Sequence, residues 1–232
     1  MSYNPLLFNK LPYDADKDFA PIARLFFLVE GMAVSNASGV RSVADLAQKA
    51  KADSSKLNFG TLGQGSFPEL VLKWLNNKWG ADIAAVPFRG GGPIAQAIAA
   101  GDLQIGNMGL GNFVSLAQAG QMKLIAVMSP KRSALVPDVP TFAEAGVGDF
   151  PARGWWGLVA PAGTPPAIIA KANAEFVKLF NEPKFAAFLE AQATVGATTS
   201  PEEFAAFVRA DREVAASLIK LANTPREDFK PD

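Results

Sequence analysis

The sequence contains no cysteine and no histidine. Without cysteine there are no disulfides, no thiolate nucleophiles and no zinc or iron–sulfur sites built on thiolates. Without histidine, the Ser–His and Cys–His catalytic pairs and the commonest protein metal ligand are missing too. Most hydrolytic and metalloenzyme mechanisms have therefore lost a member, and we expect no bound metal and no cofactor. Carboxylate and lysine chemistry stays open to an enzyme.

Net charge is also absent, because 22 lysines and arginines balance 22 aspartates and glutamates. Such a chain presents no overall positive field to a phosphate backbone, so we expect no nucleic-acid partner. The first strongly apolar run, residues 25–29, ends at Glu30. It is far shorter than the about 20 residues of a membrane-spanning helix, and it predicts a buried strand. The first five residues lack the basic end and the long apolar stretch of a secretory signal.

Hydrophobic residues make up 49% of the 232 positions, which is enough for a large core. Beyond residue 33, four apolar, β-prone runs predict strands, and each of the first three leads through a glycine-rich loop into an amphipathic helix. Such alternation is typical of an α/β fold, and the crossovers predict a mainly parallel sheet. The predicted strands are residues 57–61, 83–88, 103–108 and 123–128.

The most informative motif is the loop of residues 60–66, which combines closely spaced glycines with hydroxyls and a helix start. Thr61, Gly65 and Ser66 could present hydroxyls and backbone N–H groups to an anion. The loop lacks the ending of a phosphate-binding P-loop and the spacing of a dinucleotide fingerprint, so a carboxylate is the simpler guest. A second interpretation stays open, in which Ser66 only caps its own helix. Glu69 is expected on the surface.

Five further candidate residues lie on or just after the later predicted strands. The run Arg89-Gly90-Gly91 repeats the logic of the first loop, and both loops are expected at the carboxyl edge of the sheet. Arg89 is a candidate anion partner or a solvated surface charge. Asn107 either bonds a ligand oxygen or ties down the glycine-rich turn after it. Trp155 either lines the binding cleft or fills the core.

Five motifs stand in the order in which a known family carries them. They are YNPLLFNKLPYD at 3–14, LNFGTLGQGS at 57–66, VPFRG at 86–90, PDVPT at 137–141 and WGLVAPAGTP at 156–165. Together they resemble the TctC/Bug family of extracytoplasmic solute-binding proteins of tripartite tricarboxylate transporters. The resemblance spans nearly the whole chain.

This resemblance implies a type II periplasmic-binding-protein-like fold that closes on a small carboxylate and catalyses no reaction. The ligand would be a dicarboxylate or tricarboxylate, an amino acid or an aromatic acid, and the partners would be membrane subunits of the transporter. A periplasmic location is implied as well. Carried onto this sequence, the carboxylate-facing residues would be Thr61, Gly65, Ser66, Gly90 and Gly91.

The resemblance starts downstream of the first segment of family members, which implies an incomplete domain 1. We expect residues 1–33 to be a remnant of that domain with the crossover, and residues 154–232 to be its C-terminal part. Residues 34–153 would form domain 2, the ligand-binding lobe. Uncovered apolar surface on the incomplete domain would favour a homo-oligomer. Two positions that are commonly acidic in relatives are Gln104 and Met108.

Two other functions stay open. A truncated sensory or assembly module of the same fold would act through a protein partner and bind free carboxylates weakly. An enzyme would need Ser66 or a carboxylate as its working group, and the absence of histidine argues against it.

Overall fold

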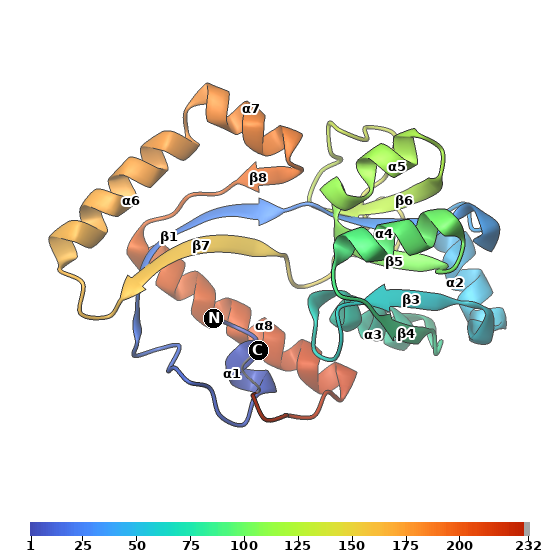
Figure 1. The fold of residues 1–232 in the computed structure, drawn as a ribbon, viewed down its shortest axis with the longest axis horizontal. Helices are drawn as coiled ribbons and strands as arrows, with labels where there is room; N and C mark the ends of the chain where they lie inside the picture. The colour runs from blue at the N-terminus through green and yellow to red at the C-terminus, as the bar shows by residue number, and fades with distance from the viewer. Residues whose placement is uncertain (230–232) are drawn as a thin grey trace. The chain divides into compact units, whose positions relative to one another are not determined.

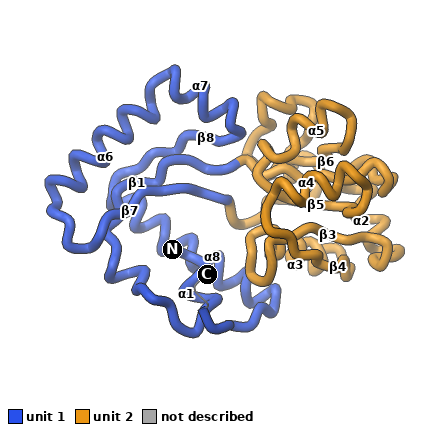
Figure 2. Tube along the Cα trace, in the orientation of Figure 1, with its two compact units in different colours: residues 1–28, 154–232 blue, residues 29–153 orange. Residues whose placement is uncertain are grey.

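The computed structural model describes residues 1–229, which divide into two compact units (Figure 2). Unit 1 is made of residues 1–28 and the chain from residue 154 onward, and unit 2 of residues 29–153. The chain therefore passes between the units twice, after Leu28 and after Arg153. None of the helices within residues 1–229 combines the length and apolar character that crossing a membrane requires.

Unit 2 is built on a five-stranded sheet with the strand order β4-β3-β5-β2-β6 (Figure 1). The strands form where the apolar runs predict them, and the additional strand β2 extends the run that begins at residue 25. The bounds are β2 Glu30–Ser35, β3 Asn58–Thr61, β4 Ala84–Pro87, β5 Ile105–Gly109 and β6 Met122–Met128.

The helices of unit 2 start and end at the residues expected from helix-end chemistry. Ser42 caps α2 by accepting the N–H of Asp45 at 3.1 Å, and Gly80 ends α3 in the left-handed conformation. The helices are α2 Val43–Ala52, α3 Phe67–Trp79, α4 Gly91–Ala100 and α5 Val114–Gln118, with short 3₁₀ turns η1 Asn36–Ser38, η2 Ser54–Lys56 and η3 Leu110–Asn112.

The expectation of mainly parallel sheets is wrong. β3 is parallel to β4 and β5, but β2 lies between β5 and β6 and is antiparallel to both. A crossover fixes only that the two strands it joins run the same way, and it leaves room for another strand between them. β5 and β6 are such a pair, and β2 comes from before the alternating segment and fills the gap in the opposite direction. The sheet of unit 1 is wholly antiparallel.

Helix α4 packs closely on one face of the unit 2 sheet. A Cβ atom added to Gly60 would lie 3.0 Å from Ile94, and one added to Gly106 would lie 2.8 Å from Ile94 and Ile98. Because successive strand residues point to opposite faces, the residues that follow these two glycines point away from α4. They belong to the face of β3 and β5 that α3 contacts.

Unit 1 has a three-stranded sheet with the order β7-β1-β8, covered by α6 and α7 on one side and α8 on the other (Figure 1). Helix α8 begins with a capping box, in which Ser200 and Glu203 satisfy each other's backbone N–H. The bounds are α1 Asn4–Leu7, β1 Phe19–Leu28, β7 Trp155–Pro161, α6 Pro166–Phe180, α7 Pro183–Ala191, β8 Thr194–Gly196 and α8 Pro201–Ala222.

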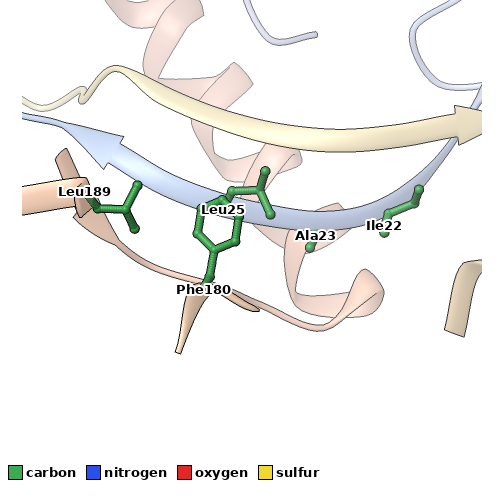
Figure 3. Close-up of a cluster of buried hydrophobic side chains, with 5 residues drawn as sticks. All are labelled: Ile22, Ala23, Leu25, Phe180 and Leu189. Atoms are coloured by element: carbon green, nitrogen blue, oxygen red, sulfur yellow. The ribbon is translucent and has the colours of Figure 1, made fainter. Parts of the chain in front are cut away.

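The core of unit 1 on the α6 and α7 side is small. Leu25 of β1 gathers with Phe180 of α6 and Leu189 of α7 (Figure 3). Phe26 stacks between Phe180 and Trp156, with ring centroids 6.2 and 6.4 Å apart. Trp156 nevertheless stays 61% exposed, because its strand β7 is at the edge of the sheet.

Candidate functional site

The strand order of unit 2 reverses between β3 and β5. The chain leaves β3 through α3 toward β4 on one side, and it leaves β5 through η3 and α5 toward β6 on the other side. In open α/β sheets, ligands bind outside the carboxyl ends of the strands at such a switch point. Thr61 ends β3, and Asn107 lies beside it on β5 and on the same face. Both side chains are buried.

The loop between β3 and α3 is shaped by the Ser66 side chain. Ser66 Oγ donates to the Gly63 carbonyl at 2.6 Å and accepts the N–H of Leu62 at 3.2 Å. Gly63 adopts a φ of 99°, which a glycine tolerates without strain. Ser66 stands at the N-cap position, but its side chain accepts no N–H from the helix. The interpretation that Ser66 only caps its own helix is therefore wrong.

The start of α3 has backbone donors that the protein leaves unused. Pro68 has no N–H, and no hydrogen bond found within residues 1–229 uses the N–H of Phe67 or of Glu69. Two donors and the positive end of a 13-residue helix thus lie at the switch point. This arrangement can hold an anionic oxygen.

Glu69 reaches back into the loop and is not a simple surface residue. Its Oε2 accepts the N–H of Gly65 at 2.6 Å. The Gly65 N–H is therefore occupied by a carboxylate of the protein itself. That carboxylate also lies in the first turn of α3, where negative charge is favourable.

The second predicted loop follows β4, the neighbour of β3. The two strand ends are tied together by the N–H of Phe88, which donates to the Thr61 carbonyl at 2.8 Å. Gly90 is the N-cap residue of α4, and Arg89 is exposed. Because α4 covers the opposite face from Thr61 and Asn107, this loop shares the sheet edge with the first loop but not its face.

Asn112 is a residue that the sequence patterns did not single out. Its Nδ2 donates to the Gly109 carbonyl at 2.8 Å, so Asn112 ties down the glycine-rich turn that follows β5. A Cβ atom added to Gly91 would lie 2.6 Å from Asn112 Oδ1, which means that Asn112 lies directly against the start of α4. Its position three residues after a glycine in a turn is the only sequence signal for this role.

Asn107 therefore has no part in fixing that turn. Its side chain is 0% exposed, and neither Nδ2 nor Oδ1 has a hydrogen-bond partner in the described part of the chain. A buried amide without a partner is costly, so it marks a position where an external polar group is expected.

Glu30 is the second residue that the site predictions omit. It begins β2, pairs with Gly109 of β5 and is only 6% exposed. Burial raises the pKa of the Glu30 carboxyl to about 7. Hydropathy gives no signal for its burial, because one acidic residue after an apolar run ordinarily marks the end of a strand.

Trp155 belongs to unit 1 and is used there for packing. Its Nε1 donates to Asp211 Oδ2 at 2.9 Å, and its ring meets the edges of Phe204 and Phe207 with centroids 5.4 Å away. The neighbouring Trp156 is the more exposed of the two tryptophans.

No group of three or more acidic side chains suited to a metal ion occurs within residues 1–229.

The sequence profile of the tripartite tricarboxylate transporter family receptors, TctC, matches residues 1–223. The chain belongs to this family, whose members are transport receptors and not enzymes. A UPF0065 protein of Bordetella bronchiseptica is 30% identical over 219 residues, which are 94% of this chain and 64% of the relative. The chain thus spans a little under two thirds of the length of that relative.

Solved structures agree with the family and with a periplasmic-binding-protein-like α/β fold. A Rhodopseudomonas palustris protein described with adipate has a TM-score of 0.88 at 26% identity, covering 97% of this chain and 76% of its own. A structure described as a periplasmic transporter has a TM-score of 0.87 at 28% identity, covering 97% and 75%. MatC of Rhodopseudomonas palustris, described with bound malate, has a TM-score of 0.78 at 29% identity, covering 92% and 74%.

Proposed function

We propose that this chain captures a small carboxylate for a tripartite tricarboxylate transporter. The ligand carboxylate would lie at the switch point of unit 2 and accept the N–H groups of Phe67 and Glu69. The hydroxyls of Thr61 and Ser66 lie at the two ends of the same loop. The observation that carries this proposal is the start of α3, where two N–H donors have no partner within residues 1–229 and lie at the place where α/β sheets bind ligands.

The relatives support the ligand class and the setting. Adipate and malate, named with two similar structures, are both dicarboxylates. Membership in the receptor family supports membrane subunits of the transporter as partners, and the similar periplasmic transporter supports a periplasmic location. For the second loop, we propose only a supporting role of Arg89, Gly90 and Gly91 at the sheet edge.

The test is a thermal-shift screen against monocarboxylates, dicarboxylates, tricarboxylates and aromatic acids, followed by calorimetry on the best ligand. A specific ligand at a hundredfold excess over its Kd stabilises the fold by about 2.7 kcal/mol. Replacing Ser66 with alanine should weaken binding about tenfold, because the loop loses two hydrogen bonds. Ser217→Ala, on the exposed face of α8, is the matched control. A screen without any stabilising acid contradicts the proposal.

A second candidate function is a module that acts through a protein partner. Trp156 and Phe188 favour it, since these large apolar side chains of unit 1 are 61% and 55% exposed. This function would be supported if no acid in the screen stabilises the protein and native mass spectrometry shows a stable oligomer.

A further inference from the structure

We propose that Glu30 and Asn107 select a ligand that carries a protonated amine beside its carboxylate. The solutes of this receptor would then be amino acids in the broad chemical sense, in preference to unsubstituted dicarboxylates. This inference rests on the proposed function and specifies the ligand class of the same site.

The geometry comes from the strand register. Met32 pairs with Asn107, and Glu30 pairs with Gly109, so Glu30 stands one diagonal step from Asn107 across two antiparallel strands. Paired residues of neighbouring strands share a face, and diagonal neighbours lie about 7–8 Å apart at their Cα atoms, within reach of long side chains. Thr61 lies on the other side of Asn107. We call Thr61, Asn107 and Glu30 the polar row.

The polar row crosses β3, β5 and β2 on the face that α4 does not cover. It starts at the loop where the ligand carboxylate is placed and ends at Glu30. A ligand anchored at α3 therefore meets Asn107 first and Glu30 next. A second polar group on the ligand, a few bonds from its carboxylate, would lie beside Glu30, at the far end of the polar row.

The side chains of Asn107 and Glu30 have no hydrogen-bond or ion-pair partner within residues 1–229. Both polar atoms of the Asn107 side chain are buried, and Glu30 is only 6% exposed. Two such groups side by side are unusual, because buried polar atoms are nearly always paired. A ligand that supplies donors would satisfy Glu30 and Asn107 Oδ1 at once.

Charge decides which donor fits best. An ionised carboxylate only accepts hydrogen bonds, and an ammonium group gives it a charge-assisted bond of about twice the strength of a neutral one. A second ligand carboxylate at this place would face Glu30 with like charge in a buried setting. Burial is the cause of the raised pKa of Glu30, and no cationic side chain within residues 1–229 counteracts it.

The test compares matched acids that differ only in the amine: aspartate with succinate, glutamate with glutarate, and alanine with propionate. The measurement is calorimetry on the full chain at a pH above 7, where Glu30 is ionised. In at least one of the three pairs, the amino acid should bind at least tenfold more tightly than the matching acid without the amine. In Glu30→Gln, the amino acid should lose at least tenfold in affinity. A dicarboxylate without the amine should bind more tightly than it binds the wild type, because the like charge of Glu30 is gone. Glu190→Gln, an exposed change on α7, is the control.

Asn107→Leu is a second variant of similar size that removes two unpaired polar atoms, so it tests the inference even if Glu30→Gln folds poorly. It should reduce the preference for the amino acid several-fold. If the unsubstituted acids bind as well as the amino acids or better, the inference is overturned while the proposed function stands. The same holds if Glu30→Gln and Asn107→Leu leave the preference intact. If none of the six acids binds while the wider screen finds another carboxylate, the inference fails and the proposed function stands.

Discussion

At the scale of single residues, Glu30 of unit 2 is a carboxyl group buried in a strand. Its position could not be predicted from hydropathy, since one acidic residue after an apolar run ordinarily marks the end of a strand. Only the register with β5 shows that the side chain points inward. The same is true of Asn107, whose burial follows from the packing of α3 and not from its own neighbours in sequence.

Glu30 predicts a pH dependence of stability. Its pKa is about 7 in the folded chain and 4.5 in the unfolded chain, so the folded state holds the proton longer. Stability should therefore fall as the pH rises from 4.5 to 7, by at most about 3 kcal/mol, and stay low above pH 7. Urea unfolding at pH 5 and pH 8 measures this change, and Glu30→Gln should abolish it.

No histidine titrates in the same pH range as Glu30, because the chain contains none. The α-amino group of Met1 titrates nearby, but burial lowers its pKa, so its contribution makes stability rise with pH. The difference between wild type and Glu30→Gln removes that contribution. If the free energy of unfolding changes equally with pH in the two proteins, burial does not raise the pKa of Glu30 and the prediction is wrong.

At the scale of elements, helices were predictable and strand neighbours were not. The helices that begin at Phe67 and Gly91 follow from apolar spacing and from glycines at their ends. The place of β2 between β5 and β6 depends on contacts between segments far apart in the sequence, and no local pattern contains it. For the same reason, the two glycine-rich loops were predicted at one edge, but their separation onto opposite faces was not.

The close packing of α4 predicts opposite effects for two glycine substitutions. Gly106→Ala places a methyl group 2.8 Å from Ile94 and Ile98, which overpacks the core and should cost about 1–3 kcal/mol of stability. Gly92→Ala lies inside α4 with no atom within 4 Å of the new methyl group, and it should stabilise by up to about 1 kcal/mol. Denaturant unfolding measures both. Equal effects would contradict the close contact between α4 and β5.

At the scale of the whole molecule, residues 130–151 contain four prolines, and the two compact units divide shortly after them, at Arg153. The first boundary, after Leu28, has no such signal, because β1 continues into β2 with a single residue between them. A strand pair that passes from one unit to the other looks in sequence like one apolar run. The roles of the two units stay proposals.

Unit 1 predicts self-association. Its edge strand β7 carries the exposed Trp156, and exposed edge strands with apolar side chains favour pairing with another chain. Trp156→Ser should weaken a dimer at least tenfold in analytical ultracentrifugation. Leu221→Ser, at an exposed apolar position on α8, is the control and should leave the dimer unchanged. A monomer at every concentration tested would contradict the prediction.

The hydrogen bond from Gly65 to Glu69 has a kinetic consequence. It fastens the loop to the first turn of α3, so the loop of the proposed binding site is held in shape by the protein itself. A preorganised surface spends little conformational entropy on capture, and encounter is then limited by diffusion and orientation instead of by loop ordering. Under the proposed function, Glu69→Ala removes this hydrogen bond and should lower the association rate of the solute more than it raises the dissociation rate.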